Sequence, residues 1–504
     1  MTLGELLEGV RALVADEAAL AGLPRDRAVS AVAYDSRRVV PGALFVALKG
    51  QKADGASYAA QAAARGALAV VSESPAPAGL TVPWLVVGDA RLALALLADR
   101  FFGHPSGRLP VVGVTGTNGK TTTAYLLAAI LDAAGLKAGM LGTVAYRIGG
   151  EDREASRTTP EAPDVQQLLH DMLEQGCRSA VMEVSSHALS LRRVDGMRFA
   201  AAIFSNLTRD HLDFHADMEA YFAAKRRLFE LLPRDAPAVI NVDDPRGASL
   251  VEICGRPVTY AIGAAADVRP GPIEMTLAGL RFEVATPRGP LQIRSRLVGK
   301  PNVYNILAAA AAAVSLDVPA AAIEQGIAGL AGVPGRFEVV SAPEDAVTVV
   351  VDYAHTDDAL RNLLETARPL AAQRLVTVFG CGGDRDRSKR PLMGMVAARL
   401  SDVVVITSDN PRSEDPRRII EEIERGIPAG SQASPRTPSV VSVVDRAEAI
   451  ERAVTLANAG DVVLVAGKGH EKYQQIGDRV LPFDDGAVAR AALARRRQRQ
   501  TKAG

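Results

Sequence analysis

Short apolar runs that each end in polar residues recur along the chain, and they predict buried strands. In the middle of the chain these runs are LPVVGVTG, SAVMEVSS, FAAAIFSN and APAVINVDD. In the last third they are TVVVDYAH, RLVTVFGC, DVVVITSDN and DVVLVAGKGH. Helical stretches separate the runs, and strands that alternate with helices form mostly parallel sheets. We therefore expect an α/β fold in which ligands gather beyond the carboxyl ends of the strands, where the polar residues lie.

Two breaks that contain glycine and proline interrupt this pattern and divide the chain. They are GHPSG at 103–107 and GVPG at 332–335, and both have the composition of linkers. A chain of 504 residues is also too long for one ordinary core. We predict three domains, which cover residues 1–107, 108–333 and 334–504.

Composition narrows the range of partners. Hydrophobic residues make up 48% of the chain and charged residues 23%, which is the balance of a soluble globular protein. Lys+Arg and Asp+Glu are equal at 58 each, so no net field recruits nucleic acid or an acidic membrane. Any phosphate must then be bound by a local site. We expect a monomer that binds no nucleic acid.

Cysteine usage and the apolar stretches indicate a cytoplasmic protein. Cys177, Cys254 and Cys381 are widely separated and form no CxxC pair, so neither a disulfide framework nor a zinc site is indicated. The N-terminus lacks the basic region and apolar run of a signal peptide. The longest apolar stretch, Ile306–Val314, is far shorter than the roughly 20 residues that cross a bilayer. We expect no membrane insertion.

The segment GVTGTNGKT, at 113–121, has the features of a phosphate-binding loop. It follows a predicted strand and precedes a helix that we expect to begin near Lys120. Glycines permit positive φ and bring backbone N–H groups close to an anion, and a helix N-terminus adds partial positive charge. Lys120 supplies a full charge and Thr121 a hydroxyl for Mg²⁺. Val114 stands where the strict GxxxxGK[ST] pattern has its first glycine. The predicted ATP contacts are Gly116, Thr117, Asn118, Gly119, Lys120, Thr121 and Thr122.

GVTGTNGKTTT resembles the variant phosphate loop of the Mur ligase family and of its folylpolyglutamate synthetase relatives. Other segments resemble blocks of Mur ligases, in order and in all three expected domains: YDSRRVVPGALFVALKGQKADG, EVSSHAL, SNLTRDHLDFH, GKPNVYNILAA, PGRFE, DYAHT, GGDRD, SDNPR and GKGHE. The resemblance implies an N-terminal nucleotide-sugar domain, a central P-loop mononucleotide-binding domain and a C-terminal Rossmann-like domain.

The resemblance also implies an activity, that of an ATP-dependent ligase of peptidoglycan synthesis, on which cell shape and division depend. The implied acceptor is UDP-MurNAc-L-Ala-D-Glu, whose D-glutamyl γ-carboxylate is phosphorylated by ATP. The amino group of an incoming amino acid then attacks the acyl phosphate, and phosphate leaves. In such phosphoryl transfer the protein mainly positions the reactants and neutralises charge.

The catalytic and metal-binding candidates are carried over from the resemblance. Glu183 and His211 lie at the ends of predicted strands, and with Thr121 they match positions that hold Mg²⁺. Lys225, in YFAAKRRLF, matches a lysine that carries CO₂ as a carbamate, an anion able to help hold a second Mg²⁺. By spacing alone, Lys225 is only one more cation in a basic run. Lys120, His211 and Lys225 are the implied catalytic residues.

Further ATP contacts are implied near the second linker. Asn302 and Asn305 in KPNVYN, and Arg336 at the linker, match positions that contact ATP. Tyr353 and His355 in DYAH match residues that flank the adenine. Taken singly, any of these could also be an ordinary polar residue at the end of an element.

The resemblance assigns the acceptor to the first two domains. The positions matched to the uracil and diphosphate are Ser36, Gln51, Lys52 and Ala53. Those matched to the peptidyl and sugar-diphosphate parts are Thr158, Thr159, Ser185 and Arg193, whose hydroxyls and guanidinium can donate to such oxygens. By itself, the sequence Asp35-Ser36-Arg37 indicates only a turn or a helix cap. Arg157 and Leu191 replace the Asn and Gln of some members, which leaves those two contacts open.

The amino-acid pocket is expected at DNPR, where a strand ends. meso-Diaminopimelate carries a second ammonium–carboxylate group, whereas lysine carries only an ammonium, so a guanidinium that can hold the carboxylate favours the former. Arg412 supplies it, Arg385 in GGDRD offers another, and Glu471 in GKGHE can accept from the ammonium. The complete predicted set is Arg385, Asp409, Asn410, Pro411, Arg412, Gly467 and Glu471.

Three alternatives compete with this prediction. A lysine-adding ligase lacks the arginine of DNPR, and a folylpolyglutamate synthetase lacks both DNPR and the N-terminal nucleotide-sugar segment. A P-loop switch or transport ATPase would be expected to carry a DExx-type strand after the loop, and none is clear. The three-part organisation favours a site that closes between domains, with GVPG as the hinge.

Overall fold

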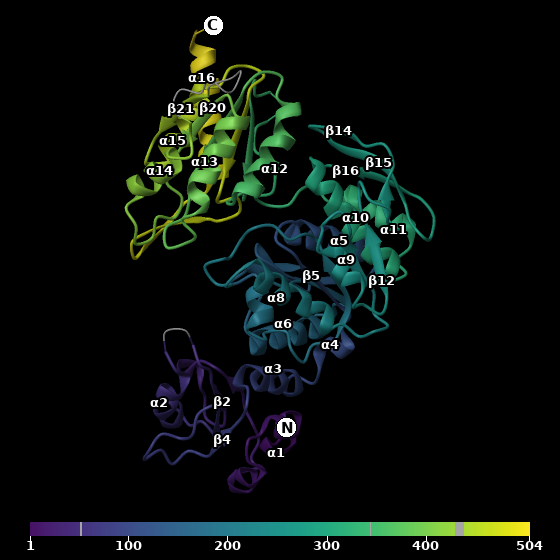
Figure 1. The fold of residues 1–504 in the computed structure, drawn as a ribbon, viewed down its shortest axis with the longest axis vertical. Coiled ribbons are helices and arrows are strands. Elements are labelled where there is room, and N and C mark those ends of the chain that lie inside the picture. Colours follow the sequence, from purple (N-terminus) through teal and green to yellow (C-terminus); the bar gives the residue numbers. More distant parts are fainter. Residues whose placement is uncertain (51–52, 343, 429–437, 504) are drawn as a thin grey trace.

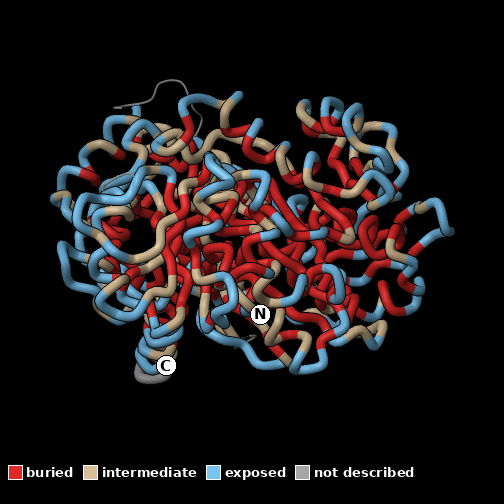
Figure 2. The backbone as a smooth tube through the Cα atoms, turned by 90° about the horizontal axis from the view of Figure 1, so that it is seen from below, coloured by how far each residue is buried: buried red, intermediate tan, exposed pale blue. Residues whose placement is uncertain are grey.

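The computed structural model describes residues 1–50, 53–342, 344–428 and 438–503. Three lobes follow one another along the longest axis, and the two ends of the chain lie in the first and the last lobe (Figure 1). Buried residues lie in the interior of the molecule, and exposed segments surround them (Figure 2). The α/β fold with three lobes that the sequence predicted is confirmed. Gln51 and Lys52, two predicted acceptor contacts, lie outside the described residues.

The first lobe is a four-stranded parallel sheet covered by short helices. Its strands, in sheet order, are β1 (Val32–Ala33), β2 (Leu44–Ala47), β3 (Ala69–Ser72) and β4 (Trp84–Val86). Its helices are α1 (Leu3–Leu7), α2 (Ala59–Ala64) and α3 (Ala90–Phe101). α1 begins with a capping box, in which Thr2 and Glu5 satisfy each other's backbone N–H groups.

The middle lobe contains an eight-stranded sheet with a parallel centre. Its strands, in sheet order, are β12 (Pro257–Tyr260), β11 (Ala238–Asn241), β10 (Phe199–Phe204), β5 (Val111–Thr115), β9 (Ser179–Glu183), β6 (Ala138–Leu141), β7 (Ala145–Ile148) and β8 (Glu151–Glu154). The last two strands pair antiparallel and the others pair parallel. Its helices are α4 (Pro105–Arg108), α5 (Lys120–Ala133), α6 (Ala162–Glu174), α7 (Ser186–Ser190), α8 (Met218–Glu230), α9 (Gly247–Val251), α10 (Lys300–Ser315) and α11 (Ala320–Gly329).

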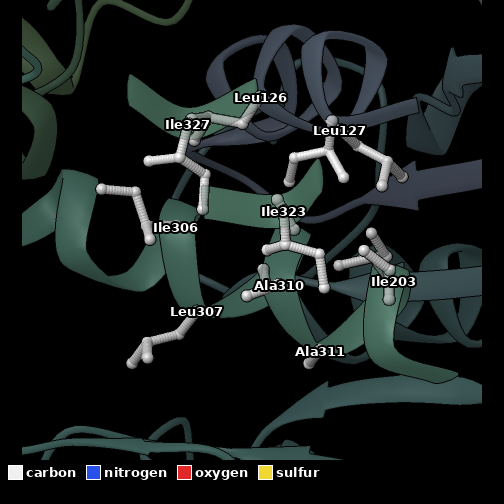
Figure 3. Close-up of a cluster of buried hydrophobic side chains, with 14 of the residues drawn as sticks. Leu126, Leu127, Ile203, Ile306, Leu307, Ala310, Ala311, Ile323 and Ile327 are labelled. Atoms are coloured by element: carbon white, nitrogen blue, oxygen red, sulfur yellow. The ribbon is translucent and has the colours of Figure 1, made fainter. Parts of the chain in front are cut away.

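The alanine-rich helix α10 lies in the core of this lobe, against α5 and the sheet (Figure 3). Ile306, Leu307 and the alanines that follow are fully buried. Alanine has the highest helix propensity and its small side chain lets neighbouring elements approach closely. α11 reaches α5 at Gly326, where a Cβ atom would overlap the backbone of Ile130. This packing fixes the helix that begins at the phosphate loop.

A small antiparallel sheet at the edge of the middle lobe was not predicted. Its strands are β13 (Arg269–Pro270), β14 (Glu274–Thr276), β15 (Gly279–Ala285) and β16 (Leu291–Ser295). β16 has the alternation of a half-buried strand, since Leu291 and Ile293 are buried and Gln292 and Arg294 are exposed. That period of two differs from the continuous apolar runs on which the strand predictions rested.

The last lobe is a doubly wound sheet. Its strands, in sheet order, are β17 (Glu338–Val339), β18 (Thr348–Asp352), β22 (Val462–Ala466), β19 (Leu375–Phe379), β20 (Val403–Ile406) and β21 (Ser439–Ser442), with only β17 antiparallel among them. One face packs against α12 (Asp357–Ala367), α13 (Lys389–Leu400) and α14 (Pro416–Glu424). The other packs against α15 (Arg446–Leu456) and α16 (Asp485–Ala503). A hairpin of β23 (Tyr473–Ile476) and β24 (Arg479–Pro482) lies beside the sheet's carboxyl edge.

Two segments predicted as linkers are ordered in different ways. Most of GHPSG belongs to α4, where Pro105 and Ser106 are buried and the Ser106 hydroxyl accepts from the backbone N–H of Arg198. GVPG forms a tight turn closed by a bridge between Val333 and Arg336. No helix in the described part of the chain is long and apolar enough to cross a membrane.

Candidate functional site

A cavity of about 270 Å³ lies between the middle and last lobes. Its walls come from the carboxyl ends of strands in both sheets, where ligands collect in open α/β sheets, from the N-terminal parts of α5 and α10, and from one face of α12. The lining residues include Thr117, Asn118, Gly119, Lys120, Thr121, Thr122, Thr158, Glu183, Ser185, His211, Asn302, Asn305, Arg336, Tyr353 and His355. Most of the predicted ATP, metal and catalytic residues therefore meet at one cavity.

The phosphate loop connects β5 to α5, and its shape depends on two glycines. Gly116 has φ 144° and Gly119 has φ 90°, both in the region that favours glycine. A Cβ atom at Gly116 would collide with the Ser205 hydroxyl, and one at Gly119 would collide with the Asn305 side chain. The loop is thus held by direct contact with β10 and α10, and the N-terminus of α5 faces the cavity.

Lys120, the first residue of α5, lies over this loop. Its Nζ donates to the carbonyl oxygens of Gly116 at 3.0 Å and Thr117 at 2.9 Å. Burial lowers the pKa of Lys120, and the nearby carboxylates of Glu183 and Asp210 act in the opposite direction. A lysine in this position can reach phosphate oxygens bound at the helix N-terminus.

Glu183 ends β9 and is 1% exposed. Its Oε2 accepts from the Thr121 hydroxyl at 3.0 Å and the Thr143 hydroxyl at 3.1 Å, and its Oε1 accepts from the Thr143 backbone N–H at 2.8 Å. The two predicted metal ligands Thr121 and Glu183 are therefore in direct contact. All three of these bonds come from neutral groups, so a buried anion faces the cavity.

His211 follows β10 and has φ 55°, a left-handed conformation uncommon outside glycine. Its Nε2 lies 3.4 Å from an Asp210 carboxylate oxygen, and its ring packs edge-on against His187. Burial lowers the pKa of His211 to about 3, although Asp210 opposes the shift. The imidazole is accordingly neutral near pH 7 and has a free lone pair to offer a cation.

Lys225 lies on α8, behind the phosphate loop, and is 1% exposed. Its Nζ donates to the Gly116 carbonyl oxygen at 2.6 Å and lies 4.3 Å from the centre of the Tyr221 ring. Burial, and then the charge of Lys120, lowers the pKa of Lys225 well below the ordinary value of a lysine. Unlike the other catalytic candidates, Lys225 reaches the cavity only through the loop.

The residues predicted around the nucleotide line the opposite side of the cavity. The Asn305 amide donates to the Asn302 side chain at 3.0 Å, and the Asn302 amide donates to the Val298 carbonyl, which fixes both side chains at the start of α10. The rings of Tyr353 and His355 lie 4.6 Å apart. Arg336 packs over the Tyr353 ring at 4.6 Å and donates to Thr121 at 3.3 Å, and it therefore links the two lobes.

The predicted acceptor contacts of the middle lobe form one cluster beside Glu183. The Thr159 hydroxyl donates to the Glu183 carbonyl oxygen at 2.8 Å and accepts from the backbone N–H of Ser185. Arg193 donates to the Thr159 carbonyl oxygen at 3.0 Å and pairs with Glu161 at 2.7 Å. Thr158 contacts Thr143 at 3.0 Å and lines the cavity.

Ser36 lies in the first lobe, near this cluster. Asp35 caps the short turn that Ser36 begins, and the Ser36 hydroxyl donates to Gln61 at 2.8 Å. The neighbouring Tyr34 donates to Asp164, in the first turn of α6, at 2.6 Å. The first lobe thus contacts the middle lobe through the segment that contains Ser36. Ala53 is exposed, and its carbonyl accepts from the backbone of Gly50.

The two departures from the family have different surroundings. Arg157 pairs with Glu161 at 3.0 Å, the same carboxylate that binds Arg193, and more than half of its side chain is exposed. Leu191 ends α7 and is partly buried. Arg157 can therefore contribute positive charge to the acceptor cluster, and Leu191 can offer only an apolar contact.

The predicted amino-acid residues meet at the carboxyl edge of the last sheet. Asn410 donates to a Glu471 carboxylate oxygen at 2.9 Å, which joins the ends of β20 and β22. Arg412 has φ 51° and donates to the Gly383 carbonyl oxygen at 2.7 Å. A Cβ atom at Gly382 would lie 3.0 Å from Arg412 and 3.8 Å from Arg385, so both guanidinium-bearing residues approach one point.

Glycine and aspartate complete this edge and connect it to the cavity. Gly467 has φ 119°, and a Cβ atom there would lie 3.2 Å from an Asp409 carboxylate oxygen. His470, which precedes Glu471, packs against the ring of Tyr353 at 4.9 Å. Tyr353 lines the cavity, and its ring therefore connects the cavity with the edge that carries the predicted amino-acid residues.

Sequence reasoning missed the buried lysine of GKGHE. Lys468 is fully buried, and its Nζ donates to Asn410 at 2.9 Å and to Glu471 at 3.1 Å, with Asp409 at 3.5 Å. One cation thus orients three of the predicted pocket residues. Its position directly after an apolar strand and between two glycines was the available signal, because a charged residue in such a place is buried only if paired.

Arg209 in the middle lobe was also missed, and it contacts two elements of the last lobe. Its signal in the sequence was weak, because the segment SNLTRDH pointed to His211 as the predicted metal ligand and gave Arg209 no role. Its partners, Asp357 and Asp386, lie far away along the chain.

The phosphate loop, the two-lobe cavity and the polar strand ends define a ligase of the ATP-dependent amide-forming class, and the chain belongs to the Mur ligase family. Three sequence models of that family match it: one described as "Mur ligase family, catalytic domain" at residues 28–102, the "Mur ligase middle domain" at 114–313, and the "Mur ligase, glutamate ligase domain" at 335–469.

Relatives named UDP-N-acetylmuramoyl-L-alanyl-D-glutamate–2,6-diaminopimelate ligase match the chain over its whole length. The protein from Solibacter usitatus is 50% identical over 98% of this chain and 98% of its own length. The one from Geobacillus thermodenitrificans is 48% identical over 93% of this chain and 96% of its own. A solved structure of an enzyme with the same name is 34% identical, covers 99% of this chain and 100% of its own, and has a TM-score of 0.68.

The fold is shared more widely. The MurF ligase from Thermotoga maritima in complex with ADP is 19% identical, covers 92% of this chain and 96% of its own, and has a TM-score of 0.61. E. coli FolC in complex with DHPP and ADP is 22% identical, covers 81% of this chain and 93% of its own, and has a TM-score of 0.58.

Proposed function

We propose that this ligase joins meso-2,6-diaminopimelate to the D-glutamyl γ-carboxylate of UDP-MurNAc-L-Ala-D-Glu at the expense of ATP. The observation that carries the choice of amino acid is the placement of Arg412 beside Arg385, at the edge where Asn410 and Glu471 meet. The relatives that match this chain at 50% and 48% identity bear the name of that activity. We assign one substrate to each proposed domain: the nucleotide-sugar end to 1–107, ATP to 108–333 and the amino acid to 334–504.

Two displacements make up the reaction. A γ-carboxylate oxygen attacks the γ-phosphorus of ATP, the bond to the bridging oxygen breaks, and ADP leaves with an acyl phosphate formed. The neutral amino nitrogen then attacks the acyl carbon, a proton is lost, and collapse of the tetrahedral intermediate expels phosphate. Lys120 and the loop N–H groups neutralise charge on the transferred phosphoryl group, and Arg336 holds the nucleotide against α5.

The residues around Glu183 fit a magnesium ion. Thr121 and His211 lie at the same cavity as Glu183 and offer oxygen and neutral nitrogen ligands, and the bonds that Glu183 accepts from Thr121 and Thr143 come from neutral groups. A bound Mg²⁺ would polarise phosphate oxygens. Among the described residues, no group of three or more His, Cys, Asp or Glu side chains is arranged to hold a metal, so the set needs a ligand of another kind.

A carbamate on Lys225, behind the phosphate loop, would help hold a second Mg²⁺. CO₂ reacts with a neutral amine, and the burial that lowers the pKa of Lys225 increases the neutral fraction near pH 7. Bond formation between nitrogen and carbon releases one proton and leaves an anion. The negative charge of the carbamate is attracted by the Lys120 ammonium. A protonated Lys225 would be repelled by that ammonium.

The amino-acid end discriminates by charge geometry. The planar guanidinium of Arg412 can hold the distal carboxylate of meso-diaminopimelate with two parallel hydrogen bonds. Glu471 accepts from the ammonium on the same carbon, while Lys468 fixes Glu471 and Asn410. Lysine has no distal carboxylate, so the Arg412 guanidinium would have no anionic partner in the bound substrate. The acceptor is held by Ser36, Thr158, Thr159, Ser185 and Arg193.

One assay separates this function from its rivals. Phosphate release is measured with ATP, Mg²⁺ and UDP-MurNAc-L-Ala-D-Glu while meso-diaminopimelate, lysine or glutamate is added in turn. We expect turnover with meso-diaminopimelate to exceed that with lysine by about tenfold or more, the value of a lost charged hydrogen-bond pair. Faster turnover with lysine would overturn the specificity, and release that needs no amino acid would indicate an ATPase.

A further inference from the structure

Arg209 occupies the contact between the ATP end and the amino-acid end of the molecule. It belongs to the turn after β10 in the middle lobe, and less than a third of its side chain is exposed. Its Nη2 donates to Asp357 at 2.9 Å, in the first turn of α12. Its Nη1 donates to Asp386 at 3.1 Å and to the Ser388 hydroxyl at 2.9 Å. A single guanidinium of the middle lobe therefore joins two separate elements of the last lobe.

The turn that carries Arg209 is bonded to the phosphate loop. Thr208, the preceding residue, exchanges hydrogen bonds with Thr117: its backbone N–H donates to the Thr117 hydroxyl at 3.0 Å, and its carbonyl accepts from that hydroxyl at 3.1 Å. The Asn118 amide donates to the Thr208 hydroxyl at 3.2 Å. Two residues after Arg209 comes His211, which lines the cavity. A displacement of the Arg209 backbone would therefore also displace the phosphate loop.

The partners of Arg209 are bonded to the amino-acid pocket. Asp386 and Ser388 belong to the 382–388 loop, which has the sequence GGDRDRS. In that loop the backbone N–H of Gly383 donates to the Asn410 carbonyl oxygen at 2.9 Å, and its carbonyl accepts from Arg412 at 2.7 Å. Asp384 accepts from the Ser413 hydroxyl at 2.6 Å. A path of hydrogen bonds and the short chain segments between them thus runs from the phosphate loop through Arg209 and the 382–388 loop to the residues proposed to hold the amino acid.

We propose that Arg209 is a positioning residue that couples the two sites: an amino acid bound at Asn410 and Arg412 tightens the hold on ATP, and ATP tightens the hold on the amino acid. Both carboxylates it joins are largely buried, which strengthens the interaction relative to a surface ion pair. Because the guanidinium is planar and has five donors, it can serve two carboxylates at once, which an ammonium cannot do with the same geometry. The proposal rests on the proposed function for the identity of the amino acid.

The test measures the coupling itself. The Kd of a non-hydrolysable ATP analogue is determined in the presence of UDP-MurNAc-L-Ala-D-Glu, with and without saturating meso-diaminopimelate. For the wild-type protein we expect the amino acid to tighten the analogue about fivefold or more, the lower range of measured couplings. For Arg209→Ala we expect the ratio to fall to near one, while the Kd without amino acid changes by about twofold or less. Arg209→Lys should retain part of the coupling.

Arg387→Ala is the matched control. Arg387 lies in the same loop as Asp386, but it pairs with Glu422 inside the last lobe. Loss of this arginine should leave the coupling at its wild-type value. Asp386→Asn, which removes one carboxylate partner, should lower the coupling less than Arg209→Ala does, and adding it to Arg209→Ala should change nothing further.

The outcomes separate this proposal from the proposed function. Wild-type coupling in Arg209→Ala, no coupling in the wild type, or equal loss in Arg387→Ala would each overturn the role of Arg209. Faster turnover by the wild type with lysine than with meso-diaminopimelate would overturn the specificity instead, and the coupling would then be measured with lysine. Melting curves on each variant establish that a lost coupling is not a lost fold.

Discussion

The carboxyl edges of the two large sheets are proposed to bind different ligands, ATP and an amino acid, and different kinds of chemical group form them. At the middle sheet, the edge consists mainly of a glycine loop, backbone groups, threonine hydroxyls and one lysine that lies over the loop, with the buried Glu183 carboxylate beside them. At the last sheet, the edge consists of side chains held by buried charges. Lys468 has no exposed surface, and Arg446 is 1% exposed and pairs with the fully buried Asp485.

This difference follows from the ligands. A phosphate group is a compact anion that backbone N–H groups at a helix N-terminus can surround, so the protein needs only the right loop shape. An amino acid with two ammonium–carboxylate groups must be met by charged side chains at defined positions. Those side chains need supports of their own, which Lys468 and the 382–388 loop provide. A phosphate site is thus made by local backbone, and an amino-acid site by long-range side-chain contacts.

The largest effect is expected behind the phosphate edge. Lys225→Ala removes the group proposed to become an anionic metal ligand, and we expect kcat to fall by about 1,000-fold, the upper range for loss of one electrostatic group. Formate or acetate added to the assay should restore part of the rate by taking the place of the carbamate. Full activity of the variant without any additive would contradict the proposed role, and the neighbouring Arg226→Ala, whose partner Glu230 is on the same helix, serves as the control.

Gly116→Ala tests whether loop shape alone defines the phosphate edge. The new methyl group would collide with Ser205 in a backbone conformation that favours glycine. We expect kcat/KM to fall by about 100-fold, because a displacement near 1 Å is enough to misplace the reacting atoms. Gly107→Ala, a glycine with open space around it, should have wild-type kinetics. A similar rate for both variants would show that the loop tolerates reshaping.

Arg412→Lys tests the charge geometry of the amino-acid edge. An ammonium keeps the charge but cannot make two parallel bonds to a carboxylate, so the KM for meso-diaminopimelate should rise about 30-fold. With saturating meso-diaminopimelate, the KM for ATP should change much less than this, because Arg412 contacts the ATP site only indirectly, through the 382–388 loop. Equal changes in the KM for ATP and in the KM for meso-diaminopimelate would contradict the distinction between the two edges.

Lys468→Met tests the buried support of that edge. The substitution leaves Glu471 and Asp409 without their cation while it preserves much of the volume. We expect the KM for meso-diaminopimelate to rise about tenfold, since a bond to a charged group contributes roughly 1.5–3 kcal/mol. The melting temperature should fall as well, because breaking a buried pair is destabilising. An unchanged KM with a lower melting temperature would show that Lys468 supports the fold and not the pocket.

The smallest effect concerns acid stability of the same edge. Hydrogen bonds from Arg390 lower the pKa of Glu414 from 4.5 to about 2, and Glu414 also accepts from the backbone of Asp384 in the 382–388 loop. A carboxyl whose folded pKa is depressed stabilises the fold above pH 4.5 and loses that contribution as the pH falls toward 2. Glu414→Gln should therefore be less stable than the wild type by about 1 kcal/mol above pH 4.5, with the difference vanishing near pH 2.

The two edges also differ in how much of their structure could be predicted from the sequence. The strands LPVVGVTG, SAVMEVSS and DVVLVAGKGH were predictable because strands buried on two faces are continuous apolar runs, and the phosphate loop because its parts are adjacent in sequence. DNPR was predicted through a resemblance, since a four-residue turn has little meaning alone. The strands of the small antiparallel sheet were missed because their period of two was not sought.

The roles of Lys468 and Arg209 were missed, because they depend largely on partners from distant parts of the chain. Lys468 pairs with Glu471 three positions later but also with Asn410, nearly sixty positions earlier, and Arg209 pairs with carboxylates of another lobe. In a sequence both are ordinary cations, which are usually solvated. Burial and a partner give them a role, and both of these come from the tertiary structure.

The pair of Arg446 and Asp485 gives the C-terminal helix a role in the shape of the site. Arg446 donates to the Ala466 carbonyl oxygen at 3.0 Å and the Ser408 carbonyl oxygen at 3.3 Å, at the ends of the two strands that hold the amino-acid residues. A chain truncated before Asp485 would lose both the carboxylate that pairs with this guanidinium and the α16 residues that cover the same face of the sheet. Proteolysis or nonsense mutation there would therefore inactivate the enzyme, although every residue proposed to contact a substrate comes before the cut.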